Sequence, residues 1–64
     1  MDLFIEKTKE KMALKFSGTA KALLTQLKIN PETVIVVRNG FLVTLDSELS
    51  DSDKVKILSV ISGG

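Results

Sequence analysis

The sequence has 64 residues, a formal net charge of +1, and neither cysteine nor histidine. A chain this short folds as one domain, in which an enclosed active-site pocket is hard to build. The missing residue types exclude disulfides, thiolate nucleophiles, Cys/His zinc sites and histidine general bases. The small net charge provides no bulk electrostatic attraction to nucleic acids or membranes.

Residues 3–16 predict a β-hairpin. Leu3–Glu6 and Lys11–Phe16 are rich in apolar residues, and the polar segment Lys7–Glu10 separates them. Every second residue from Met12 to Phe16 is large and apolar, which is the period of a strand with one buried face. We therefore expect two strands joined by a polar loop.

The lysines of this hairpin raise the alternative of a nucleic-acid patch formed by Lys7, Lys9, Lys11 and Lys15. No tyrosine or tryptophan lies among them, and Glu6 and Glu10 interrupt the positive charge. Nucleic-acid surfaces typically combine basic residues with stacking aromatics. A solvated loop is therefore the preferred interpretation, and we expect no nucleic-acid partner.

The first residues also bear on location. The stretch Met1–Lys7 contains acidic residues and lacks the features of a signal peptide. No apolar run approaches the roughly 20 residues that a membrane-spanning helix needs. We expect a cytoplasmic protein without a membrane partner.

The next segment changes to the period of a helix. One apolar stripe follows the spacing i, i+3, i+4, i+7 and consists of Ala20, Leu23, Leu24 and Leu27. Thr19 is the expected N-cap, with Ser17 as the alternative. Pro31 cannot continue a helix, so we expect a helix of about ten residues with one apolar face.

A second hairpin follows the helix. The β-branched run Val34–Val37 leads to Asn39-Gly40 and then to the apolar run Phe41–Leu45. Asn-Gly between apolar runs favours a type I′ turn. Whether Phe41 or Leu42 faces the core is left open by the sequence.

The last part is an acidic loop followed by a strand. The loop, residues 46–53, is expected to contain one short helical or bulged turn around Leu49. Its acidic residues lack the spacing and the glycine of an EF-hand, so we expect no metal site. In the following strand Val55 and Ile57 alternate with lysines, which indicates one buried face.

The order β-β-α-β-β-loop-β predicts an α+β domain. One helix covers only one face of a mixed sheet of four to five strands, giving two layers. If the sheet wraps the helix, the first and last strands are central and adjacent, which is the ubiquitin-like β-grasp arrangement. We expect residues 1–61 to form this domain and residues 62–64 to form a flexible tail.

Three stretches of the sequence resemble the ThiS/MoaD family of ubiquitin-like sulfur carrier proteins: SGTAKALLTQLKINPETVIVVRNG, LSDSDKVKI and the terminal SGG. Two positions depart from the family pattern. Lys28 stands where a glycine commonly follows the helix, so we expect the helix end to be shaped differently. Arg38 stands where an apolar residue is usual, and we expect it to bury its stem and keep its charged head in water.

The resemblance implies a carrier, not an enzyme. A ThiF/MoeB-like adenylyltransferase would use ATP to activate the carboxylate of Gly64, and the carrier itself would bind no cofactor. A cysteine desulfurase would supply sulfur for a Gly64 thiocarboxylate. The acceptor would be an enzyme such as thiazole synthase or the large subunit of molybdopterin synthase, or one that thiolates tRNA. Gly63 would help to thread the partner's active site, because a residue without Cβ permits close approach.

The sheet face away from the helix is the expected docking surface. Alternation along the strands predicts an exposed apolar patch there, and such patches commonly mark partner sites. The patch is expected to contain Ile35, Val37, Phe41, Leu58 and Val60. In this hypothesis Val37, Phe41 and Leu58 dock the body while Gly63 and Gly64 enter the active site.

Two alternative functions remain open. In the first, the chain is a ubiquitin-like modifier joined through Gly64 to protein lysines. In the second, it is a β-grasp interaction module in which the two glycines are incidental. Deleting Gly64 separates the module from the other two functions, because only the module tolerates the deletion.

Overall fold

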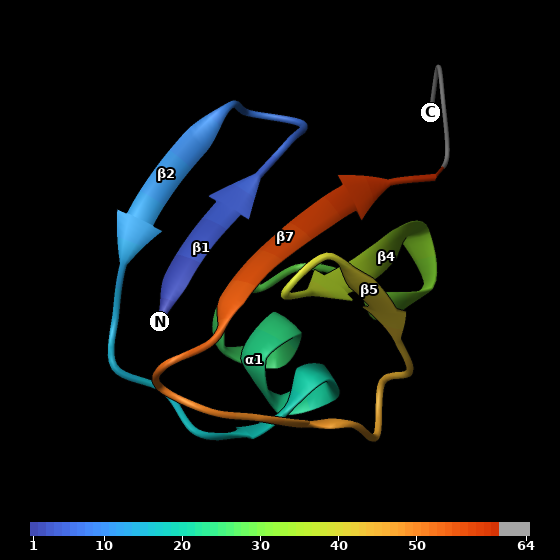
Figure 1. Cartoon of the computed structure of the whole chain (residues 1–64). Helices are drawn as coiled ribbons and strands as arrows, with labels where there is room; N and C mark the ends of the chain where they lie inside the picture. The colour runs from blue at the N-terminus through green and yellow to red at the C-terminus, as the bar shows by residue number, and fades with distance from the viewer. Residues whose placement is uncertain (61–64) are drawn as a thin grey trace.

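The computed structural model describes residues 1–60, which form a sheet wrapped around one helix (Figure 1). In chain order the elements are β1 (Asp2–Ile5), β2 (Glu10–Ala13), β3 (Gly18–Thr19), α1 (Ala20–Gln26), a single 3₁₀ turn η1 (Pro31–Thr33), β4 (Val34–Arg38), β5 (Phe41–Val43), β6 (Glu48–Leu49) and β7 (Lys54–Ser59).

The main sheet has five strands in the order β2-β1-β7-β4-β5. The last strand, β7, lies at its centre, parallel to β1 and antiparallel to β4. The outer pairs β1–β2 and β4–β5 are antiparallel hairpins. The predicted β-grasp arrangement, with its mixed sheet and adjacent first and last strands, is confirmed.

The core lies between α1 and one face of this sheet. Leu23 and Leu24 of the helix are fully buried, and they pack in one cluster with Leu3, Val36 and Ile57 from the strands. Burying a leucine side chain stabilises a fold by about 2 kcal/mol, so this layer supplies much of the stability of so small a domain. No helix in residues 1–60 is long and apolar enough to cross a membrane.

The start of α1 agrees with the sequence prediction. The Thr19 hydroxyl accepts a hydrogen bond from the Ala22 N–H at 3.1 Å, so Thr19 and not Ser17 is the N-cap. This bond satisfies one of the backbone donors that a helix leaves unpaired at its first turn.

The end of α1 corrects the sequence prediction. Lys28 adopts φ +60°, the left-handed conformation that was expected only of glycine. The Ile29 N–H donates to Leu24 O (2.9 Å) and the Lys28 N–H donates to Thr25 O (3.1 Å), which together form a Schellman motif. The helix therefore ends before Pro31, after seven residues rather than about ten.

The second hairpin turns at Asn39-Gly40, as predicted. Both residues have positive φ, 50° and 88°, which is the signature of a type I′ turn. The strand after the turn, β5, covers only Phe41–Val43 and is shorter than the predicted apolar run Phe41–Leu45.

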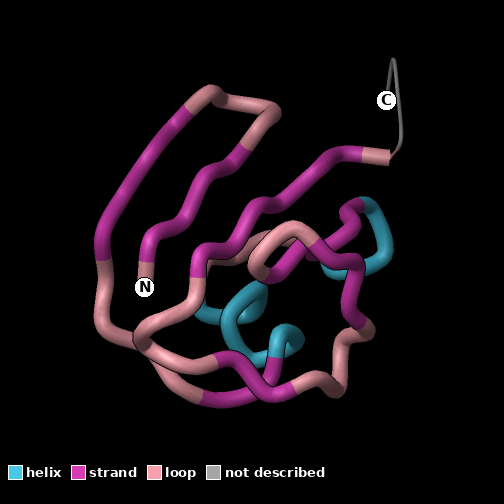
Figure 2. Tube along the Cα trace, viewed as in Figure 1, coloured by secondary structure: helices cyan, strands magenta, loops and turns pink. Residues whose placement is uncertain are grey.

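A small second sheet was not predicted. Gly18 pairs with Leu49 and Thr19 pairs with Glu48, so the expected turn at Leu49 is the two-residue strand β6. Leu49 is buried in the core. Figure 2 shows the chain between β5 and β7 running along the segment that enters the helix, where these two short strands meet.

Candidate functional site

The sheet face opposite α1 is the candidate docking face. Along β7, Val55 and Ile57 are buried toward the helix, whereas Lys54, Lys56 and Leu58 alternate with them. Side chains that alternate along a strand point to opposite faces. The register then assigns each neighbouring strand residue to the helix face or to this open face.

Four of the five residues predicted for the patch share the open face. Ile35 pairs with Leu58, and Val37 pairs with Lys56. Val60 follows β7 and its N–H donates to Thr33 O at 3.0 Å, which keeps it beside the start of β4. Ile35 and Val60 are 37% and 49% exposed, so apolar surface lies around the end of β7.

Phe41 is exposed, as predicted, but it does not share the face of the predicted patch. It pairs with Arg38, whereas Leu42 pairs with Val37. Phe41 is therefore on the helix side of the sheet, at an edge where α1 does not cover it, and is 75% exposed. Leu42, 69% exposed, is the residue of β5 that lies on the open face.

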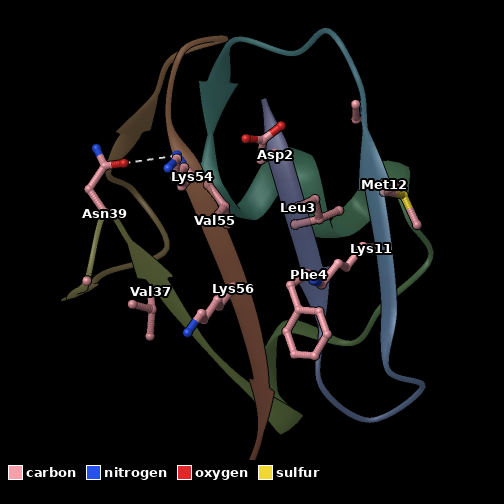
Figure 3. Close-up of a pocket in the computed structure, with 12 residues that line it drawn as sticks. Asp2, Leu3, Phe4, Lys11, Met12, Val37, Asn39, Lys54, Val55 and Lys56 are labelled. Atoms are coloured by element: carbon pink, nitrogen blue, oxygen red, sulfur yellow. Dashed lines mark hydrogen bonds between the residues drawn. The ribbon is translucent and has the colours of Figure 1, made fainter.

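Sequence reasoning also missed Phe4. This half-buried aromatic pairs with Lys11 of β2 and with Lys56 of β7, so all three lie on the open face. Together with Val37 they line an open hollow on this face (Figure 3). The signal was present in the alternation of Phe4 with Leu3 and Ile5, but only the pairing of β1 with β7 shows what surrounds the ring.

Asp53 does not line this hollow but holds Asn39, which does. Its carboxylate accepts hydrogen bonds from the Ser50 N–H (2.8 Å) and the Asn39 amide (3.0 Å), and it lies 3.6 Å from Arg38 Nε. The Ser50 N–H first, then the Asn39 amide and the Arg38 charge, hold the pKa of Asp53 below its ordinary value of 3.8. The Asn39 side chain also accepts from the Lys54 N–H, as the dashed line in Figure 3 shows.

Arg38 is more constrained than predicted. Its side chain is 41% exposed, so the head does reach solvent, but Nη1 also donates to Glu48 O at 2.9 Å. The Arg38 side chain thus joins the end of β4 to β6 and to Asp53. This arrangement fixes the turn between β4 and β5 beside the start of β7.

Gly63 and Gly64, and the predicted flexible segment 62–64, lie outside the described residues. The described chain leaves β7 at Val60, on the same end of the sheet as Ile35 and Leu58. The candidate functional site therefore consists of an open face with apolar and basic residues, from which the chain continues toward Gly64.

Comparisons with known proteins identify the family of the chain. The family model described as the ThiS family matches residues 3–64. The sulfur carrier protein TtuB of Thermus thermophilus is 38% identical over 56 residues, which cover 88% of this chain and 86% of TtuB. An uncharacterized protein of Archaeoglobus fulgidus is 45% identical over 42 residues, covering 66% of this chain and 61% of that protein.

A solved structure is similar over its whole length. The crystal structure of the thiamine biosynthesis protein ThiS from Geobacter metallireducens has a TM-score of 0.67 and 27% sequence identity, covering 100% of both chains. The family match includes nearly every residue, and the fold match includes both the helix layer and the mixed sheet. The chain belongs to the ThiS family of ubiquitin-like sulfur carrier proteins.

Proposed function

We propose that the chain carries sulfur as a thiocarboxylate on Gly64. The observation that supports this most is that the match to the ThiS family extends to residue 64 and so includes Gly63-Gly64. The name of TtuB as a sulfur carrier protein supports the same function. The chain has no cysteine of its own, so the thiols of the sulfur relay are assigned to partner proteins.

The carboxylate of Gly64 is a poor acyl donor and is activated first. The Gly64 carboxylate attacks the α-phosphorus of ATP in a ThiF/MoeB-like adenylyltransferase, pyrophosphate leaves, and an acyl-adenylate forms. The terminal sulfur of a persulfide, supplied through a cysteine desulfurase, then displaces AMP. A partner thiol cleaves the resulting acyl disulfide, which releases the thiocarboxylate and leaves a disulfide on the partner.

The body docks through the open face while the tail reaches the nucleotide. We assign docking to Ile35, Val37 and Leu58, with Val60 beside the tail and Leu42 in the place expected for Phe41. Gly64 is four residues beyond Val60, so the Cα atoms of the two lie at most about 14 Å apart when the chain is extended. The activated carboxylate therefore reacts within that distance of the last described residue.

The acceptor of the sulfur is proposed by class. It is an enzyme that incorporates sulfur into a thiazole ring, a molybdopterin or a tRNA base. The similarity to a thiamine biosynthesis protein supports the thiazole product, whereas TtuB, which is more identical, is named only as a sulfur carrier.

Activation by a ThiF-type adenylyltransferase tests the proposal. The wild-type chain is expected to support ATP-dependent release of pyrophosphate, and the chain lacking Gly64 is expected to support none, because it presents the wrong terminal carboxylate. Equal activity of the two chains would contradict the proposal. A Lys21→Ala variant, changed on the exposed side of α1, serves as the control and should behave like the wild type.

A further inference from the structure

One row of side chains crosses the entire open face. The register pairs Lys11 with Phe4, Phe4 with Lys56, Lys56 with Val37, and Val37 with Leu42. We call these five residues the cross-sheet row. It takes one residue from each strand of the main sheet, so its members have fixed neighbours.

The row contains closely spaced positive charges. Adjacent strands lie about 4.8 Å apart, so the backbones of Lys11 and Lys56 are about 10 Å apart with Phe4 between them. Lys54 lies on the same face, two residues before Lys56. Asp2, paired with Lys54, is the one acidic residue that the described strands of the main sheet place on this face.

These three lysines are exposed, and Asp2 lies beside Lys54 alone. Among residues 1–60, no ion pair involves Lys11, Lys54 or Lys56. Their charge is therefore available to a partner, although like charges this close repel one another. The surface beside the half-buried ring of Phe4 is basic, while the chain as a whole is nearly neutral.

Edge protection does not explain these lysines. Lysine commonly lies on edge strands, where it prevents pairing with another sheet, and this reason applies to Lys11 on β2. It does not apply to Lys54 and Lys56, because β7 is the central strand and is paired on both sides. On the central strand Lys54 and Lys56 are exposed residues of the open face, where a partner that covers this face would contact them.

We propose that the cross-sheet row and Lys54 bind an acidic surface on the activating enzyme. This inference rests on the proposed function. The surface that complements the row follows its order, with a carboxylate opposite Lys11, an apolar recess for Phe4 and a second carboxylate opposite Lys56. An apolar strip beyond it covers Val37 and Leu42. Charges so arranged raise the association rate and fix the orientation of docking.

A protein surface fits the row better than a nucleic acid does. Single-stranded nucleic acids are bound by successive aromatic rings on which bases stack. The row supplies one aromatic residue, half-buried Phe4, and its other apolar members, Val37 and Leu42, are aliphatic. Aliphatic side chains beside lysines suit an apolar recess with an acidic rim.

Single charge reversals on the full chain test the inference. Lys56→Glu and Lys11→Glu are each compared with Lys21→Glu, which makes the same charge change on the exposed side of α1. The readout is kcat/KM for pyrophosphate release by a purified ThiF-type enzyme at about 0.05 M and about 0.3 M KCl. Melting temperatures confirm that each variant is folded.

The open-face reversals should lower kcat/KM roughly threefold to tenfold at low salt, mainly through KM. The difference from wild type should shrink at high salt because ions screen exposed charges. Lys21→Glu should match the wild type, and kcat at saturation should be unchanged because the reacting group is at Gly64.

The contradicting outcomes are distinct. If all three variants match the wild type, this inference fails and the proposed function stands. If the wild-type chain is not activated at all, both fail. If Lys56→Glu instead loses binding to a fluorescent single-stranded oligonucleotide while activation is unchanged, the face is a nucleic-acid surface and the inference is wrong.

Discussion

At the scale of single residues, Lys28 occupies a conformation that costs it energy. A non-glycine residue in the left-handed region is less stable than glycine there by about 1 kcal/mol. The Schellman motif nevertheless forms, since Ile29 and Leu24 are joined by the 2.9 Å backbone bond and Ile29 packs against the core. Tertiary packing thus holds the helix end in a shape that the Lys28 side chain does not favour.

Lys28→Gly should therefore raise the free energy of unfolding by about 0.5–1 kcal/mol, less than the full strain because glycine also makes the unfolded chain more flexible. Urea denaturation of the two proteins measures the difference. Lys28→Ala is the matched control, because it removes the charge and keeps Cβ. A gain in the alanine variant equal to that in the glycine variant would show that charge, not backbone strain, is responsible.

Asp53 links its charge to stability. Because its pKa is lower in the folded chain than its ordinary value of 3.8, the carboxylate contributes stability that is fully present above that value. The contribution is lost as pH falls from about 4 through the lower folded pKa. Asp53→Asn should therefore be less stable than wild type at pH 7, with a smaller difference at pH 2.

Thermal melts at several pH values check this prediction. The variant should still lose some stability in acid, since the Thr44 hydroxyl also holds the pKa of Asp46 below its ordinary value. A constant difference between the two proteins from pH 7 to pH 2 would contradict the role assigned to the Asp53 charge.

At the scale of elements, β5 carries two exposed apolar residues on opposite faces. Leu42 is beside Val37 on the open face, and Phe41 is beside Arg38 on the other. If the partner docks on the open face, a change at Leu42 affects docking more than the same change at Phe41. Both residues are highly exposed and both are next to the same turn.

Leu42→Glu should raise the KM for the chain in the activation assay roughly tenfold, as for a truncated anchor in an interface. Phe41→Glu, a change of the same kind one residue away, should have a smaller effect. Circular dichroism establishes that both variants are folded. A larger effect at Phe41 than at Leu42 would place the docking surface on the helix side of the sheet.

The same elements show what a sequence predicts and what it does not. The α1 stripe, the Thr19 cap and the Asn39-Gly40 turn were predicted because each depends on neighbours in the chain. The strands β3 and β6 were missed because a strand of two residues is too short to show an alternating pattern in the sequence. The face of Phe41 depended on where β5 begins to pair with β4, which a one-residue shift reverses.

The candidate site also combines features that depend on neighbours in the chain with features that depend on pairing between distant strands. Alternation within a strand was enough to place Ile35, Val37 and Leu58 on the open face. Phe4 and Lys56 are 52 positions apart, and only the parallel pairing of β1 with β7 makes them neighbours. The structure therefore adds the basic part of the face, whereas the sequence had indicated the apolar part.

At the scale of the whole molecule, the two faces of the sheet have different roles. One face packs on α1 and stabilises the domain, and α1 does not cover the other, which is the proposed docking face. The central strand β7 contributes to both, with Val55 and Ile57 in the core and Leu58 on the open face. Since β7 also leads toward Gly64, docking of the face would place the tail relative to the partner's active site.

The most direct test of sulfur carriage is the intact mass of the chain isolated from its native host. We predict a form whose mass exceeds that of the free acid by the difference between sulfur and oxygen, with the change located in the terminal peptide that contains Gly64. The chain lacking Gly64 should show no such form. Isolation of only the free acid from cells that are actively using the pathway, or of Gly64 joined to lysines of other proteins without any sulfur-bearing form, would contradict the account.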